Sequence, residues 1–185
     1  MTKTRPCVGV IGSGTEKHPQ LSNPLGRWLA KQECDLINGG GGGVMEAVSQ
    51  AFTEVSDRKG NVIGVIPSSS PCDSPEARSA YAPLPGYPNA WVDIPIYTHL
   101  PLSGASGKGM GSRNHIIILS ADVIIAFPGG AGTRSEIQLA LEYGKSLLIL
   151  NPNHEWNEFK NTPAPMAENP EEAIQWLAKN IFQIE

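Results

Sequence analysis

The amino-acid sequence predicts an α/β fold in which a single domain is built on a doubly wound parallel sheet. The expected strands are continuous apolar runs, which is typical of strands that helices cover on both faces of a sheet. Along the chain these runs alternate with segments of helical periodicity, the order from which parallel sheets are built. The chain has 185 residues, 40% of them hydrophobic and 17% charged, which suffices for one domain with its own core. We find no repeat and no internal domain boundary.

The first 55 residues contain two strands and two helices in alternation. Residues 7–11 form an apolar run that ends at a glycine turn, which predicts a buried strand. Asn23 and Pro24 are typical of a helix start, because asparagine caps a helix and proline favours its first position. A second strand is expected at 35–38 and a second helix at 44–55, where apolar residues recur with the period of a helix.

The middle of the chain contains the longest irregular segment. A third strand is expected at 61–66 and is stopped by Pro67. The following stretch, up to Ala90, is rich in proline, serine and alanine, and its length indicates a functional or mobile loop. A short strand at 92–97 and a helix at 114–119 come next.

The C-terminal third returns to regular alternation. Residues 122–127 form the clearest strand of the chain, followed by a helix at 133–143 and a strand at 147–150. Asn169 and Pro170 predict the start of a last helix, which carries apolar residues as far as Ile181.

The charge balance and hydropathy exclude two classes of partner. The chain has 14 basic and 18 acidic residues, a net charge of −4, and no basic stripe, so we expect no binding of nucleic acid. No apolar run approaches the roughly 20 residues of a membrane span, so we expect no membrane insertion. The start, Met1 to Pro6, leads into only five apolar residues, too few for a signal peptide, and we expect a cytoplasmic location.

The metal-binding residue types are scattered. Cys7, Cys34 and Cys72 have no CxxC spacing, which argues against a disulfide framework and against a zinc site. The four histidines show no HExxH motif and no pairing at helical spacing. We therefore expect no metal site.

Three glycine-bearing turns are the candidates for ligand binding. They lie at Gly12 to Gly14, Gly39 to Gly43 and Pro128 to Thr133, and each leads from a strand towards a helix N-terminus. In a doubly wound sheet, ligands bind beyond the carboxyl ends of the strands. Free N–H groups and the helix dipole favour an anion there, and glycine lets the backbone approach it. The sequence therefore predicts a pocket for a small phosphate-bearing molecule.

The familiar nucleotide motifs do not fit these turns. Lys17 stands where a dinucleotide fingerprint requires its third glycine, and no acidic residue follows the second strand. The segment Gly107-Lys108-Gly109 lacks the serine or threonine of a P-loop. An NAD enzyme and a P-loop NTPase are both disfavoured.

Two charged residues are candidates for the site. Arg113 opens a helix in a glycine-rich region, and its guanidinium matches phosphate, although a surface arginine is the alternative. Glu136 follows Thr133 in the T-x-x-E pattern of a capping box, so its carboxylate either caps the helix or serves a ligand.

Residues 128–136 (PGGAGTRSE) resemble the PGGxGTxxE motif of the Lonely Guy/lysine-decarboxylase-like family. Gly43-Val44-Met45 is similar to the Gly-Leu-Met segment of that family, and Arg113 falls where the family has its arginine. The resemblance extends over about residues 7–150. It implies a Rossmann-like fold and homo-oligomers (dimers or tetramers). It also implies, for the enzymes of the family, cleavage of cytokinin riboside 5′-monophosphates to free base and ribose 5-phosphate.

The chain departs from the enzymes at two acidic positions. The enzymes usually read PGGxGTxEE, whereas Ser135 stands at the first glutamate, and Ser112 precedes Arg113 where the enzymes have another glutamate. Cleavage of a ribosyl bond calls for carboxylates, so their absence weakens the enzymatic interpretation. A phosphoribohydrolase with Arg113 and Glu136 as catalytic residues stays the alternative.

The segments Gly-Val-Met-Glu-Ala and Ser-Arg-Asn are similar instead to a sister group, the molybdenum cofactor carrier proteins. That resemblance implies storage and protection of the molybdenum cofactor (molybdopterin) without catalysis. The phosphate of the cofactor would lie at the glycine turn after residue 128, and the segment from Pro67 to Ala90 would cover the pterin. We rank the carrier first, the hydrolase second, and a nucleotide-binding protein with neither role third.

The residues and the resemblance together define one set of expected cofactor-binding positions. They are Gly12, Ser13, Gly14, Gly40, Gly41, Gly42, Gly43, Met45, Arg113, Asn114, Gly129, Gly130, Ala131, Gly132, Thr133 and Glu136.

Overall fold

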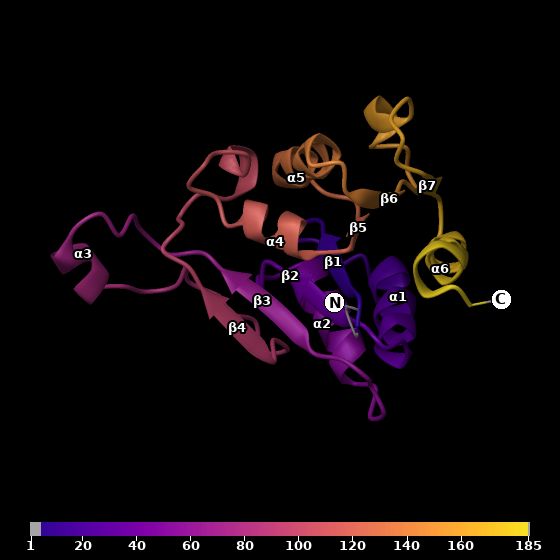
Figure 1. Cartoon of the computed structure of the whole chain (residues 1–185), viewed down its shortest axis with the longest axis horizontal. Coiled ribbons are helices and arrows are strands. Elements are labelled where there is room, and N and C mark those ends of the chain that lie inside the picture. Colours follow the sequence, from indigo (N-terminus) through magenta and orange to yellow (C-terminus); the bar gives the residue numbers. More distant parts are fainter. Residues whose placement is uncertain (1–4, 185) are drawn as a thin grey trace.

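Seven parallel strands form one sheet in the computed structural model, which describes residues 5–184 (Figure 1). Met1 to Thr4, where we expected no signal segment, lie outside the described residues. The strand order is β4-β3-β2-β1-β5-β6-β7, so the doubly wound parallel sheet predicted from the sequence is confirmed. The strands are β1 (Cys7–Ile11), β2 (Asp35–Asn38), β3 (Val62–Ile66), β4 (Ile94–Tyr97), β5 (Val123–Ala126), β6 (Ser146–Leu150) and β7 (Met166–Ala167).

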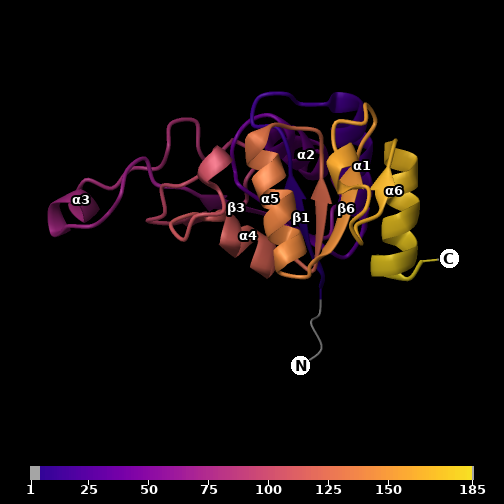
Figure 2. The ribbon, with the colours of Figure 1, turned by 90° about the horizontal axis from the view of Figure 1, so that it is seen from above.

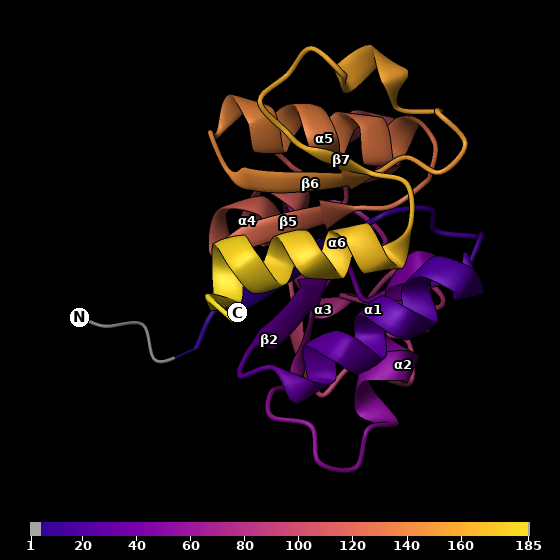
Figure 3. The ribbon, with the colours of Figure 1, turned by 90° about the vertical axis from the view of Figure 1, so that its right-hand side faces the viewer.

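Helices cover both faces of the sheet (Figure 3). One layer holds α1 (Pro19–Lys31), α2 (Val44–Thr53) and α6 (Pro170–Leu177), and the other holds α4 (Asn114–Ser120) and α5 (Ala131–Glu142). Their apolar faces meet the strands in two buried clusters, one around Phe52 and the other around Ile117. Burial of each such side chain contributes about 1.5–3 kcal/mol. The short elements are α3 (Pro75–Ser79), η1 (Gly104–Ser106), η2 (Asn157–Phe159) and a π-helical turn, η3 (Ala178–Phe182).

No helix among residues 5–184 has both the length and the apolar character needed to cross a membrane.

The boundary of α1 differs from the prediction. The helix begins at Pro19 rather than at Asn23, and Pro24 lies inside it. Both prolines can occupy a first helical position, and the sequence alone does not distinguish them. Inside a helix, Pro24 lacks the N–H that would bond to the carbonyl of Gln20.

The remaining differences are small. The helix expected at 133 begins two residues earlier, at Ala131, and the helix expected up to Ile181 gives way to η3 after Leu177. Strand β7 was not predicted, because two residues are too few to produce a pattern.

The segment between Pro67 and Ala90 extends away from the sheet as an arm (Figures 1 and 2). Its one helix, α3, is capped by Ser74, whose hydroxyl accepts the N–H of Ala77 at 3.1 Å. Backbone bonds between the two sides of the arm hold its base, among them Leu84 N–H to the Pro67 carbonyl at 3.1 Å. The arm returns to the sheet next to the glycine turn after β2, where Asn89 donates to the Gly40 carbonyl at 2.7 Å.

The chain reverses its direction of winding at β1. The segment from β1 to β4 builds one half of the sheet, and β5 then returns to pair with β1 on its other side. The chain after β1 therefore leads to a helix on one face of the sheet, and the chain after β5 leads to a helix on the other face. Open α/β sheets bind their ligands at such a point.

We expect Pro24→Ala to stabilise the protein, because it restores a backbone N–H inside α1. The free energy of unfolding should rise by about 1–3 kcal/mol, measured by denaturant unfolding. Pro19→Ala is the matched control at the first helical position, where proline is favourable, and it should leave stability unchanged or lower it by less than about 1 kcal/mol. Equal effects of the two substitutions would contradict this account of α1.

Candidate functional site

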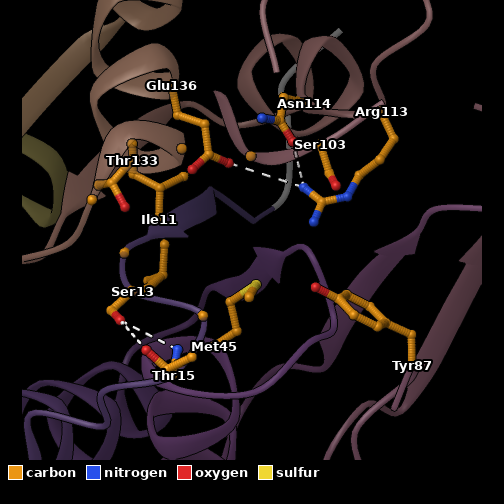
Figure 4. Close-up of a pocket in the computed structure, with 16 residues that line it drawn as sticks. Ile11, Ser13, Thr15, Met45, Tyr87, Ser103, Arg113, Asn114, Thr133 and Glu136 are labelled. Carbon is orange, nitrogen blue, oxygen red and sulfur yellow. Dashed lines mark hydrogen bonds and ion pairs between the residues drawn. The ribbon is translucent and has the colours of Figure 1, made fainter. Parts of the chain in front are cut away.

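A pocket lies at the carboxyl ends of β1 and β5 (Figure 4). The two strands end in turns that are joined by backbone hydrogen bonds: Phe127 N–H to the Ile11 carbonyl at 2.8 Å, and Ser13 N–H to the Pro128 carbonyl at 3.1 Å. The cavity has a volume of about 380 Å³, within the usual range for small-molecule sites. The place between β1 and β5 where the sheet reverses its winding thus opens into a pocket of a size that suits a small molecule.

Most of the residues expected from the sequence line this pocket. They are Gly12, Ser13, Gly14, Met45, Arg113, Asn114, Gly130, Gly132, Thr133 and Glu136. The other expected positions lie outside the lining: Gly40, Gly41, Gly42, Gly43, Gly129 and Ala131.

Two N–H groups at the ends of the glycine turn after β2 form hydrogen bonds within the protein. The Asn38 carboxamide oxygen accepts the N–H of Gly40 at 2.8 Å, and the Ser13 carbonyl accepts the N–H of Val44 at 2.9 Å. Gly43 has φ +61, and a Cβ there would overlap the Ser13 carbonyl oxygen. The two hydrogen bonds occupy the N–H groups of Gly40 and Val44, and the second of them supports the neighbouring β1 loop.

The turn after β1 also forms hydrogen bonds within the protein. The Ser13 hydroxyl accepts the N–H of Thr15 at 3.2 Å and that of Glu16 at 2.9 Å. Since the N–H of Ser13 bonds to Pro128, these three N–H groups are not free for a ligand.

The N-terminus of α5 has backbone N–H groups that no side chain caps. Gly130 is the N-cap, and no side chain caps the helix. The N–H groups of the first helical turn, from Ala131 to Thr133, therefore lack an intrahelical acceptor and lie at the positive end of the helix dipole. Gly129 lies beneath them, and a Cβ there would overlap the Thr133 hydroxyl oxygen. Among the turns around the pocket, the N–H groups of Ala131 to Thr133 are therefore the best suited to an anion, and we call them the anion seat.

Arg113 is buried in another wall of the same pocket, with only 4% of its surface exposed. Its Nη1 donates to the Asn114 carboxamide oxygen at 2.5 Å, and its Nε is buried without a hydrogen-bond partner within residues 5–184. A Cβ on Gly39 would overlap the guanidinium, so the missing side chain at position 39 provides its space. The surface-arginine alternative is wrong.

Glu136 faces the pocket from α5 rather than capping the helix. Thr133 is inside α5, because the N-cap is Gly130, and so the capping-box hypothesis is wrong. The carboxylate lies 4.0 Å from Arg113 Nη1, and the side chain is 13% exposed. Burial raises the pKa of Glu136 to about 7, against the opposing attraction of Arg113. The pocket therefore contains a carboxyl group that titrates near neutral pH.

Ser135 points away from the pocket. Its hydroxyl donates to the carbonyl of Gly132 at 2.7 Å and to that of Gly104 at 3.2 Å. The position at which the enzymes carry glutamate is thus used here to hold the loop that contains η1.

Sequence reasoning missed part of the lining: Val10, Ile11, Thr15, Tyr87, Ser103 and Gly104. Thr15 extends a turn that the sequence had marked, and Val10 and Ile11 belong to the strand before it. Tyr87, Ser103 and Gly104 come from irregular segments, and only the excess of proline and glycine marked those as functional loops.

No cluster of three or more histidine, cysteine, aspartate or glutamate side chains suited to a metal ion occurs in the described part of the chain.

Comparisons with known proteins identify relatives over nearly the whole chain. The sequence model of the SLOG cluster4 family matches residues 5–175. An uncharacterized protein of Archaeoglobus fulgidus is 31% identical over 172 residues, covering 91% of this chain and 92% of its own.

Two solved structures share the fold. The molybdenum cofactor binding protein of the phototrophic bacterium Rippkaea orientalis aligns with a TM-score of 0.72 and 29% identity, covering 97% of this chain and 99% of that chain. The molybdenum cofactor carrier protein of Chlamydomonas reinhardtii aligns with a TM-score of 0.70 and 26% identity, covering 95% of this chain and 97% of that chain. Both likenesses extend over nearly complete chains.

We expect Glu136→Gln to alter the pH dependence of stability. Because burial raises its pKa from 4.5 to about 7, the folded protein binds more protons at this site than the unfolded chain between those values. The contribution of Glu136 to stability therefore falls as pH rises through this window. At pH 8 the glutamine variant should be more stable than the wild type, by about 3 kcal/mol at most, and at pH 4 the two should be similar.

Denaturant unfolding at several pH values measures this difference. Glu33→Gln removes an exposed carboxylate and is the control, with an expected change within about 0.5 kcal/mol at every pH. Parallel stability curves for wild type and Glu136→Gln would refute the raised pKa.

We expect Gly39→Ala to displace the Arg113 guanidinium and to cost about 1–3 kcal/mol of stability, as overpacking does. In an Arg113→Ala background the same change should cost much less, because the space is then empty. Gly14→Ala is the control, since a Cβ there meets no atom within 4 Å. Thermal and denaturant unfolding of the double-mutant cycle measures the coupling, and additive effects would disprove the contact.

Proposed function

The chain belongs to the SLOG cluster4 family, and from this premise we propose that it is a molybdenum cofactor carrier protein. In this function the protein binds the cofactor, stores it and protects it without changing it chemically. The likeness to the proteins of Rippkaea orientalis and Chlamydomonas reinhardtii supports this choice within the family.

The observation that carries the proposal is the uncapped N-terminus of α5, which opens into a pocket that also contains a buried arginine. The cofactor ends in a phosphate monoester. We place that phosphate at the N–H groups that follow Gly130, where the helix dipole favours an anion. Arg113 adds a fixed positive charge on another wall of the same pocket.

The buried groups of the pocket fit an anionic ligand with further acceptor atoms. Arg113 Nε has no hydrogen-bond partner within the described residues, and a buried donor without a partner costs about 1–3 kcal/mol. A ligand acceptor removes that cost. Glu136 has a pKa of about 7, so it accepts a proton when a negative ligand binds nearby, and this lowers the repulsion.

The position of Ser135 also favours a carrier. A phosphoribohydrolase has to activate water and stabilise a ribosyl cation, and it needs carboxylates in the pocket. Glu136 is the one carboxylate of the described lining, and Ser135 faces the η1 loop instead. Glu136 is nevertheless the observation that keeps the hydrolase as a second candidate, because a carboxyl group with a pKa near 7 suits acid–base chemistry.

The sequence and the resemblance to the family also suggest the location, oligomeric state and partners of the protein. We propose a cytoplasmic homo-oligomer that exchanges the cofactor with other proteins and binds neither nucleic acid nor membranes.

Retention of the molybdenum cofactor tests the proposal. Wild-type protein mixed with the cofactor under anaerobic conditions should carry it through gel filtration and slow its loss of activity-restoring capacity. Gly130→Asp should lose the cofactor, because its carboxylate at the N-cap repels the phosphate. A Cβ at position 130 meets no atom within 4 Å, and aspartate is a good N-cap, so this variant should fold.

Gly130→Asn is the matched control, since asparagine has a similar shape and capping ability without the charge. It should retain the cofactor better than Gly130→Asp. Failure of the wild type to retain the cofactor would refute the carrier function. Release of free base from AMP by the wild type, abolished in Glu136→Gln, would establish the hydrolase in its place.

A further inference from the structure

Tyr87 contributes an aromatic side chain to the pocket from outside the core of the sheet. Among the described residues that line the cavity it is the only aromatic one, and it belongs to the arm between Pro67 and Ala90. Its ring is partly exposed, and its hydroxyl has no hydrogen-bond partner within residues 5–184. Figure 4 shows Tyr87 and Arg113 on the side of the pocket opposite Thr133 and Ser13. This aromatic group therefore faces the anion seat from across the cavity.

The position of Tyr87 is defined by the glycine turn after β2. A Cβ on Gly41 would overlap the tyrosine ring, so the ring lies directly on the backbone of that turn. Two residues along the chain, Asn89 donates its backbone N–H to the Gly40 carbonyl at 2.7 Å and its side-chain amide to the Gly41 carbonyl at 2.8 Å. These two hydrogen bonds hold the end of the arm, and with it the ring of Tyr87, against the glycine turn.

The same turn positions Arg113. The guanidinium occupies the space at Gly39, and the tyrosine ring occupies the space at Gly41. The Cα atoms of residues 39 and 41 lie within about 7 Å of each other, the length of two extended residues. The glycine turn thus supports both a planar cation and an aromatic ring, and the absence of side chains at Gly39 and Gly41 provides the space for them.

Three side chains on this part of the pocket share an affinity for flat, electron-rich rings. The tyrosine offers an aromatic face, for which stacking of a nucleobase is worth about 1–3 kcal/mol. The guanidinium of Arg113 is planar, and its unpartnered Nε is a donor for a ring carbonyl or ring nitrogen. Met45 supplies a polarisable thioether on the adjacent wall.

We propose that Tyr87, Arg113 and Met45 form a subsite for a planar nitrogen heterocycle, the ring of the ligand whose phosphate lies at α5. Tyr87 is the residue that selects for an aromatic ring over an aliphatic group. Pterins and purines share the chemistry that such a subsite recognises. The inference deepens the proposed function and rests on it only for the choice of a pterin as the ring.

Binding of phosphate-free probes tests the subsite separately from the anion seat. We expect 6-hydroxymethylpterin to bind the wild-type protein, measured by quenching of its fluorescence, and Tyr87→Ala to weaken that binding roughly 5- to 150-fold, as loss of a stacking partner does. Tyr87→Phe should retain most of the affinity. Binding of inorganic phosphate, measured by calorimetry, should be the same in all three proteins.

Two further variants complete the test. Tyr81→Ala removes an exposed tyrosine of the same arm, which packs on Tyr97 rather than in the pocket, and it should bind the pterin as the wild type does. Gly130→Asp should show the opposite pattern to Tyr87→Ala, with weak binding of phosphate and undiminished binding of the phosphate-free pterin. Thermal unfolding of each variant confirms that it is folded, and Asn89→Ala, which unfastens the ring without removing it, should also weaken pterin binding.

Adenosine as a second probe separates this inference from the carrier function. Binding of adenosine that depends on Tyr87, in a protein that does not retain the molybdenum cofactor, would support the subsite while refuting the carrier. Pterin binding unaffected by Tyr87→Ala, or a wild-type protein that binds neither heterocycle, would overturn the subsite.

Discussion

The backbone of Ser13 holds the site together. Its N–H bonds to the carbonyl of Pro128 in the turn after β5, and its carbonyl accepts the N–H of Val44 at the start of α2. One residue therefore joins the three turns that follow β1, β2 and β5. Such close approach requires glycine around it, since side chains on Gly43 or Gly129 would overlap the Ser13 backbone. The shape of the pocket depends on this packing.

The same packing decides which N–H groups remain for a ligand. The hydrogen bonds that hold the turns after β1 and β2 occupy five N–H groups, those of Ser13, Thr15, Glu16, Gly40 and Val44. The N-terminus of α5 is not fastened in this way, and its first turn opens into the cavity. Burial of Glu136 next to it raises the pKa of that carboxyl, and this costs stability at neutral pH. Groups that are unfavourable for folding are common where a ligand has to be recognised.

The glycine turn after β2 acquires its role only through distant parts of the chain. Arg113, from the loop before α4, fills the space at Gly39, and Tyr87, from the arm, fills the space at Gly41. Both contacts bring together residues more than 40 positions apart in sequence. The proposed anion seat and the proposed ring subsite lie on opposite sides of one pocket, which suits a ligand with a phosphate at one end and a heterocycle at the other.

Local sequence patterns were sufficient for the fold class, for six of the seven strands and for a large part of the pocket lining, including Gly130, Thr133 and Arg113. Apolar runs, helical periodicity and glycine turns report on neighbouring residues, and these features depend on neighbours. Only the tertiary structure decided that α1 begins at Pro19, that Glu136 faces the pocket instead of capping α5, and that the glycine turn after β2 makes room for two distant side chains. Tyr87 likewise reaches the site through the path of the arm. Each of these outcomes depends on which buried groups find partners across the fold, and contacts between residues far apart in the chain leave no periodic signal in the sequence.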